Sequence, residues 1–252
     1  MDSRVPSLER ERYFLRWLTK VRPTLGELFI LGDLFEFFFE YRHAVPKGFT
    51  RLLGRLAELA DEGVRIHYFV GNHDLWLKNY LTEEAGMQVY WAPERIERFG
   101  REMLVGHGDG LSPFDGKYRR LKRLFTNPLA QWLYRWLHPD VGIPLARYFS
   151  QQSREAQLPT DARPFDPQKD GLVLFARQWA QAHPSVRYII MGHRHIAHRM
   201  QVSEQCTYYN VGDWLHLFTY GQLTAEGMHL WQYLPGEDAV RPLGADEIVR
   251  NV

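Results

Sequence analysis

Four apolar runs in this sequence each end at a glycine that is followed by residues able to bind a metal ion. The four endings are Gly-Asp at 32–33, Gly-Asn-His-Asp at 71–74, Gly-His-Gly-Asp at 106–109 and Gly-His-Arg-His at 192–195. Carboxylate oxygen, amide oxygen and imidazole nitrogen suit manganese, iron or zinc. An aspartate can bridge two such ions, which polarise a phosphoryl group and generate hydroxide from bound water at neutral pH. The endings therefore predict the metal centre of a hydrolase.

The elements that carry these endings are expected to be strands of an α/β protein. The predicted strands are Glu27–Leu31, Val64–Val70, Met87–Trp91, Arg95–Phe99, Met103–Val105, Val186–Met191, Thr207–Val211 and Met228–Tyr233, and the predicted helices are Ser7–Val21, Pro46–Glu62 and Gly171–His183. Ligands in α/β sheets bind beyond the carboxyl ends of strands, so the four endings are expected to meet at one edge. A fifth strand end, Asn210-Val211-Gly212-Asp213, is as consistent with a turn as with a site, and Asp213 stays outside the predicted metal shell.

Composition limits the remaining possibilities. The chain has 252 residues, 45% of them hydrophobic and 24% charged, which is typical of a globular enzyme. It contains no run of about 18 apolar residues and no secretory signal, so a cytoplasmic chain without a transmembrane anchor is expected. Cys206 is the single cysteine, which excludes an intrachain disulfide and a thiolate metal site. The net charge of +1 gives no indication of nucleic-acid binding.

Residues from Leu111 to Pro167 interrupt the alternation and predict a helical insertion, or cap. Its apolar stripe is Leu129, Trp132, Leu133, Trp136 and Leu137, and between Lys117 and Arg154 it carries eight basic residues against one acid, Asp140. Packing against the protein body is the favoured interpretation of the stripe, and an acyl pocket or membrane contact is the alternative. The basic residues fit equally a solvated helix face or a surface for anionic phosphates and head groups.

Taken together, the four endings resemble the successive signatures of calcineurin-like metallophosphoesterases. The resemblance spans about Leu28 to Val211 and implies a four-layer α/β/β/α sandwich, here a single domain over 1–252 with the cap at about 111–167. It implies two divalent ions, with Mn²⁺ favoured over Zn²⁺ or Fe²⁺. In the implied site Asp33 bridges the metals, Asn72, His107 and His193 complete one site, and His195 belongs to the other. His73 protonates the leaving group or stabilises the transition state, and Asp74 orients His73.

The sequence also departs from this family pattern. No Asp-x-His signature precedes Glu27, and Asp2-Ser3-Arg4 does not replace it. The expectation is that the first strand of the family fold is missing, through truncation, a misplaced start or degeneration. One metal site would then keep only Asp33 and His195.

The cap residues resemble one branch of the family, which acts in lipid A biosynthesis. That branch hydrolyses UDP-2,3-diacylglucosamine to UMP and 2,3-diacylglucosamine 1-phosphate. The resemblance rests on Gly32–Glu36, the insertion after His107, and Ser153–Gln157. It makes Asp115, Tyr118, Ser153 and Arg154 the expected substrate contacts, a nucleotide-sugar lipid the expected partner, and the inner-membrane surface a partner of the cap.

Two alternatives to this branch stay open. The well-known branch has arginine where His73 stands, so this chain is either a divergent member or a relative. A phosphodiesterase or phosphatase for another nucleotide or lipid is one alternative. A non-catalytic binding protein, degenerate because Asp-x-His is absent, is the other.

Overall fold

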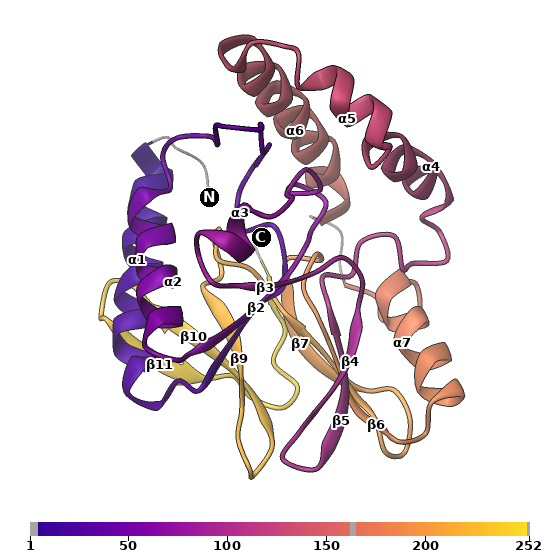
Figure 1. Ribbon diagram of the computed structural model, residues 1–252. Helices are drawn as coiled ribbons and strands as arrows, with labels where there is room; N and C mark the ends of the chain where they lie inside the picture. The colour runs from indigo at the N-terminus through magenta and orange to yellow at the C-terminus, as the bar shows by residue number, and fades with distance from the viewer. Residues whose placement is uncertain (1–4, 162–164, 251–252) are drawn as a thin grey trace. The chain divides into compact units, whose positions relative to one another are not determined.

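The computed structural model describes residues 5–161 and 165–250, with the side chains of residues 5–7 and 153–161 outside the description. The chain divides into two compact units, and Figure 1 labels its helices and strands. The first unit comprises Met1–Trp91 and Gly116–Pro159, and the second comprises Ala92–Asp115 and Thr160–Val252. No helix within the described ranges is long and apolar enough to cross a membrane.

The first unit is built on a parallel sheet with strand order β1-β2-β3. Its elements before residue 92 are α1 (Val5–Val21), a 3₁₀ turn (Arg22–Thr24), β1 (Glu27–Ile30), α2 (Thr50–Asp61), β2 (Arg65–Phe69), α3 (Tyr80–Glu83) and β3 (Gln88–Tyr90). Ile30 of β1 lies opposite Tyr68 of β2, so the two strands end at the same edge of the sheet. Parallel strands require such helical crossovers, and Leu18, Leu52 and Leu56 supply fully buried contacts from α1 and α2.

The segment after β1 is held by aromatic packing. Phe35, Phe38 and Phe39 are buried almost completely, and the Phe35 and Phe38 rings lie 4.5 Å apart. Phe39 forms a backbone bridge with Trp76 and a ring contact with it at 4.8 Å. The loop that begins at Asp33 therefore has a rigid continuation.

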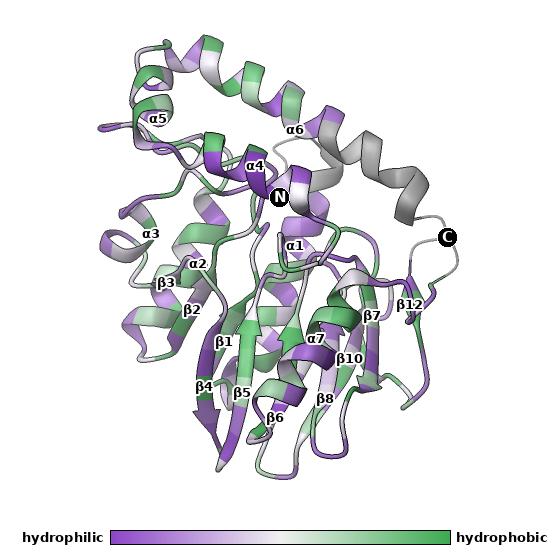
Figure 2. Cartoon of the chain, turned by 90° about the vertical axis from the view of Figure 1, so that its right-hand side faces the viewer, coloured by the Kyte–Doolittle hydropathy of each residue, from purple (hydrophilic) through white to green (hydrophobic). Residues whose placement is uncertain are grey.

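The predicted cap forms three helices of the first unit: α4 (Gly116–Phe125), α5 (Pro128–Tyr134) and α6 (Pro139–Asp161). Asn127 caps α5, because its side-chain oxygen accepts hydrogen bonds from the backbone of Leu129 and Ala130. Hydrophobic residues recur along α5 and α6 (Figure 2). The prediction that the apolar stripe packs against the protein body is wrong, because its side chains are exposed. Leu129 is 64% exposed, Trp132 52%, Leu133 57% and Trp136 75%.

Other cap side chains do contact the body of the first unit. Tyr134 packs on Trp76 with ring centroids 4.6 Å apart, and Trp76 Nε1 donates a hydrogen bond to the Phe125 carbonyl. Arg135 donates a hydrogen bond to the Glu40 carbonyl. The cap is therefore attached through polar groups and Tyr134, while its predicted stripe remains at the surface.

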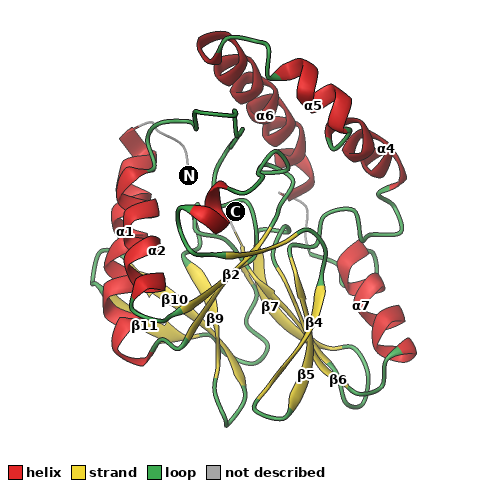
Figure 3. Cartoon of the chain, viewed as in Figure 1, coloured by secondary structure: helices red, strands yellow, loops and turns green. Residues whose placement is uncertain are grey.

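The second unit contains a mixed six-stranded sheet with order β12-β7-β8-β6-β5-β4 and an antiparallel sheet with order β11-β10-β9 (Figure 3). Its elements are β4 (Glu94–Arg98), β5 (Arg101–Gly106), α7 (Gly171–Ala182), β6 (Val186–Met191), β7 (Ile196–Gln201), β8 (Thr207–Val211), β9 (Thr219–Leu223), β10 (Met228–Leu234), β11 (Ala239–Pro242) and β12 (Val249–Arg250). β5, β6 and β8 run parallel to one another, so their carboxyl ends share one edge.

The core of the second unit lies between α7 and the six-stranded sheet. Val173 and Ala176 of α7 pack with Ile189 of β6 and Tyr208 of β8, all of them fully buried. Cys206 belongs to the same core, and burial raises the pKa of its thiol to about 11. This core fixes the strands that end at His107 and His193.

Candidate metal centre

Asp33 follows β1 in a backbone conformation that few residues adopt. Gly32 has φ +84° and Asp33 has φ +52°, which turns the chain sharply at the strand end. The Asp33 carboxylate accepts a hydrogen bond from the His73 backbone N–H at 2.9 Å. A Cβ atom on Gly71 would lie 2.2 Å from Asp33 Oδ1, so only glycine allows the two loops this close approach.

Asp74 is completely buried and holds the second of these loops. One carboxylate oxygen accepts a hydrogen bond from Gly71 N at 2.5 Å, and the other accepts one from the Tyr68 hydroxyl. Burial, reinforced by the Asp74 charge, raises the pKa of Tyr68 well above its usual value, so Tyr68 stays a donor. These bonds fix the conformation of residues 71–74, and orientation of His73 by Asp74 stays a prediction.

His73 has two oxygen atoms facing its Nδ1 atom. Ser150 Oγ of α6 lies 2.7 Å from Nδ1, and the Glu36 carbonyl oxygen lies 3.2 Å from it. Ser150 Oγ donates its own proton to the Glu36 carbonyl at 2.8 Å and can therefore accept from His73. A proton on His73 Nδ1 can be donated to these oxygen atoms. The contact also brings Ser150, a residue of the cap, against His73, the predicted acid.

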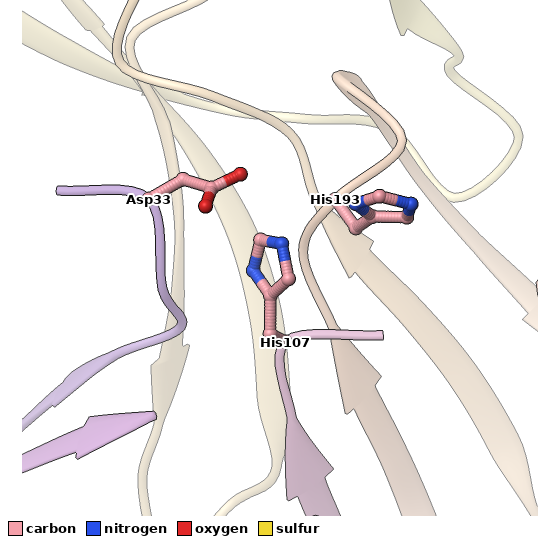
Figure 4. A group of neighbouring side chains, drawn as sticks. All are labelled: Asp33, His107 and His193. Atoms are coloured by element: carbon pink, nitrogen blue, oxygen red, sulfur yellow. The ribbon is translucent and has the colours of Figure 1, made fainter. Parts of the chain in front are cut away.

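The second unit brings together His107 and His193. His107 follows β5 and is buried, His193 follows β6, and their rings lie 5.0 Å apart at 67° (Figure 4). One ligand nitrogen of each lies within 4.8 Å of one of the other, a separation that two ligands of one ion can have. Gly192 N donates a hydrogen bond to the His107 carbonyl at 2.9 Å, which ties the two strand ends together.

The loop containing His193 and His195 has a strained backbone, and hydrogen bonds from two neighbouring elements stabilise it. His193 has φ +68° and His195 has φ +50°, which costs of order 1–3 kcal/mol for each such residue. Asp170 caps α7 with one carboxylate oxygen and accepts a hydrogen bond from Arg194 Nε at 2.9 Å with the other. Asn210 donates its side-chain N–H to the Gly192 carbonyl at 2.7 Å. These hydrogen bonds stabilise a conformation that the loop would not adopt alone.

Asp213 forms a turn, which is one of the two interpretations that the sequence left open for this strand end. Its Oδ1 atom accepts hydrogen bonds from the backbone N–H groups of Leu215, His216 and Leu217 at 2.8–3.1 Å. Its Oδ2 atom lies 3.6 Å from His195 Nδ1. Asp213 was placed outside the predicted metal shell, and its contact with a predicted ligand was not foreseen.

The expected substrate contacts are described to different degrees. Asp115 is half-buried in the second unit, and Tyr118 is half-buried in α4 of the first unit. Ser153 and Arg154 lie in α6, but their side chains are outside the described residues. Their predicted role is therefore a proposal.

The residue types predicted as ligands suit a divalent metal ion. Asp33 and Asn72 belong to the first unit, and His107, His193 and His195 belong to the second. Figure 4 labels three of these five side chains, Asp33, His107 and His193. Carboxylate, amide and imidazole donors without sulfur match the preferences of manganese, iron and zinc. The sequence had already indicated all five residues. Ser150 and Asp170 gave no signal, because nothing in the local sequence shows which distant residue a polar side chain will contact.

Comparison with known proteins agrees with this chemistry. Residues 9–197 match the family model of the calcineurin-like phosphoesterases. The chain belongs to this family. Membership confirms the predicted α/β metallophosphoesterase fold, a metal-dependent hydrolase, and a requirement for divalent metal.

Proteins named UDP-2,3-diacylglucosamine hydrolase are similar to the chain over most of its length. The one from Porphyromonas gingivalis is 38% identical over 227 residues, which cover 83% of this chain and 84% of that protein. The one from Pseudomonas fluorescens is 32% identical, covering 81% and 80%. The one from Shewanella baltica is 28% identical, covering 92% and 93%.

Proposed function

We propose that this chain hydrolyses UDP-2,3-diacylglucosamine to UMP and 2,3-diacylglucosamine 1-phosphate in lipid A biosynthesis. The observation that carries the proposal is the 38% identity to a hydrolase of that name over most of both chains. The cap supports it, because a lipid substrate needs apolar surface and a diphosphate needs nearby basic groups.

The proposed centre would hold two Mn²⁺ ions. Asp33, Asn72, His107 and His193 would hold one ion, and Asp33 and His195 would hold the other. Bound ions of this kind polarise the phosphoryl group and lower the pKa of water. A single ion, or Zn²⁺ or Fe²⁺ in place of Mn²⁺, is an outcome that metal analysis of the purified protein distinguishes.

His73 acts as the acid for the leaving group in this proposal. With the proton of Nδ1 directed at Ser150 Oγ and the Glu36 carbonyl, Nε2 is the nitrogen that exchanges a proton with the substrate. Asp115, Tyr118, Ser153 and Arg154 contact the nucleotide-sugar lipid. General acid catalysis by one side chain contributes about 10²–10⁴-fold to a rate.

We further propose that the cap attaches the protein to the cytoplasmic surface of the inner membrane. Among the described side chains of α5, α6 and the residues between them, seven large apolar ones are more than half exposed: Leu129, Trp132, Leu133, Trp136, Val141, Tyr148 and Phe149. The basic residues of α4, Lys117, Arg119, Arg120, Lys122 and Arg123, would add attraction to anionic lipid. Reversible attachment of this kind suits an enzyme whose substrate resides in the bilayer.

The test is release of UMP by the purified full chain with Mn²⁺ and UDP-2,3-diacylglucosamine in mixed micelles. We expect release by the wild type, loss of at least about 100-fold in Asp33→Ala and His107→Ala, and no change in the exposed control His229→Ala. Unchanged release after both ligand substitutions would contradict the metal-dependent mechanism.

A substrate panel separates the alternatives. Faster hydrolysis of short soluble phosphodiesters than of the lipid would favour a phosphodiesterase of another pathway. Binding of the lipid without turnover of any substrate would favour a non-catalytic module.

A further inference from the structure

One oxygen atom of Asp213 has no role in the turn that this residue forms. Oδ1 alone accepts the three backbone hydrogen bonds from residues 215–217. Oδ2 is buried and has no hydrogen-bond partner among the described residues, and the side chain as a whole is only 7% exposed. A buried acceptor left without a partner costs free energy, about 1–3 kcal/mol and more for a charged group. An asparagine oxygen could accept the same three hydrogen bonds without placing a charge in this buried position, so the turn does not explain the carboxylate.

The group that faces the unused oxygen is His195. Oδ2 lies 3.6 Å from His195 Nδ1, slightly beyond hydrogen-bond length. Rotation of the imidazole by a small angle would shorten this distance, and the His195 side chain has room to rotate because it is 33% exposed. The carboxylate itself is fixed, since its other oxygen is held by three N–H groups.

The surrounding chain fixes Asp213 relative to the histidine loop. Both supports come from the carboxyl end of β8 and the turn after it: Asn210, in β8, donates a hydrogen bond to the Gly192 carbonyl at the start of the loop, and Asp213, two residues after β8, lies beside His195. Gly212, between them, has φ +77°, and a Cβ atom there would lie 2.1 Å from Thr219 Oγ1. Only glycine therefore fits at the bend that directs Asp213 toward His195.

We infer that Asp213 is a positioning residue for His195 in the metal centre. When Nδ1–H of His195 donates to Asp213 Oδ2, the proton is fixed on Nδ1 and Nε2 is left unprotonated as the metal-binding atom. The carboxylate also stabilises the orientation of the imidazole ring. This inference rests on the proposed metal centre but not on the proposed substrate.

The test measures metal binding without substrate. Mn²⁺ is titrated into metal-free protein, and the free ion is counted by its electron paramagnetic resonance signal. We expect Asp213→Asn to weaken binding at the His195 site about 10–100-fold, the usual effect of losing such a support. The amide oxygen retains the turn, so the free energy of unfolding of the metal-free protein should change little. Asp246→Asn, at an exposed aspartate of the same unit, is the matched control and should bind Mn²⁺ as the wild type does.

A double substitution distinguishes positioning from a general structural effect. In a His195→Ala background, Asp213→Asn should cause no further loss of Mn²⁺ affinity, whereas an effect through the fold would persist. If Asp213→Asn does not fold, Asp213→Ser provides the same test, because a serine hydroxyl also caps turns. Equal Mn²⁺ titrations of the wild type and Asp213→Asn would overturn the inference. Failure to release UMP from the lipid would not affect it.

Discussion

His198 shows how burial of one titratable side chain makes the stability of the second unit depend on pH. Burial lowers the pKa of His198 to about 4, and its Nδ1 atom has no hydrogen-bond partner in the part of the chain that the structure describes. Because the unfolded chain titrates near 6.5, between pH 6.5 and 4 the unfolded state binds more protons than the folded state. The contribution of His198 to stability is complete above pH 6.5 and is lost as the pH falls toward 4.

We expect the difference of about 2.5 units to correspond to about 3 kcal/mol across this range. Urea unfolding at pH 7 and pH 5 should show a smaller decrease in the free energy of unfolding for His198→Gln than for the wild type. His229→Gln, at an exposed histidine of the same unit, should keep the wild-type decrease. Identical decreases in all three proteins would contradict the assignment.

Alanine in place of Gly71 should impair metal binding, whereas alanine in place of Gly54 should stabilise the fold. Gly71→Ala places a Cβ atom 2.2 Å from Asp33 Oδ1, and we expect it to displace Asp33 and abolish Mn²⁺ binding at the bridged site. Gly54→Ala, in the exposed face of α2, meets no atom within 4 Å. It should raise the free energy of unfolding by about 0.5–1 kcal/mol, because alanine loses less backbone entropy in a helix. Metal titration and urea unfolding of both variants check the pair.

At this scale the sequence was sufficient for the proposed ligands but not for their supports. Asp33, Asn72, His107, His193 and His195 could be predicted because each follows a glycine at the end of an apolar run. Ser150 and His73 lie 77 positions apart, and nothing local to either marks their contact. Asp213 was ambiguous because Gly-Asp is a common turn sequence, and its two oxygens have different surroundings.

At the scale of elements, α6 connects the cap to the proposed acid. Ser150→Ala removes the nearer of the two acceptors at His73 Nδ1. We expect kcat for UMP release to fall about fivefold to tenfold with KM nearly unchanged, since one hydrogen bond contributes about 1 kcal/mol. Ser150→Thr keeps the hydroxyl and should restore kcat.

A structural role of Ser150 would give a different pattern. In a His73→Gln background, Ser150→Ala should then still lower activity, whereas an effect that acts through His73 should disappear.

The exposed tryptophans of the cap should bind lipid. Burying such a side chain in a membrane gains about 1.5–3 kcal/mol, so we expect Trp132→Ala with Trp136→Ala to weaken binding to anionic vesicles at least tenfold in a sedimentation assay. Trp91→Ala is the matched control, because Trp91 is 52% exposed but lies outside the cap. Equal binding of all variants would contradict attachment through the cap.

The elements that could be predicted were those whose hydrophobic residues recur with a clear periodicity or form an apolar run. β6 and β8 have the predicted bounds, and the predicted cap is helical. β7, β9, β11 and β12 were not predicted, because their residues mix polar and apolar types and they are strands through antiparallel pairing with neighbours. The apolar stripe was expected to be packed because helical spacing indicates one face of a helix but does not identify what covers it.

At the scale of the whole molecule, the proposed ligands come from both compact units. Metal that binds only the folded chain stabilises it, by about 2.7 kcal/mol at a free concentration 100 times the Kd. We expect chelation to lower Tm, added Mn²⁺ to restore it, and Asp33→Ala to respond less to both. Differential scanning calorimetry measures these shifts. A wild-type Tm that is indifferent to chelation and to Mn²⁺ would contradict metal binding by the folded chain.

The buried thiol in the core of the second unit makes this chain suitable for site-specific labelling. With its pKa raised to about 11, Cys206 remains unreactive toward maleimide dyes near neutral pH. A cysteine introduced in place of Trp136 would then be the one accessible thiol in the sequence. A fluorophore attached there reports directly on the polarity that the cap encounters when vesicles are added.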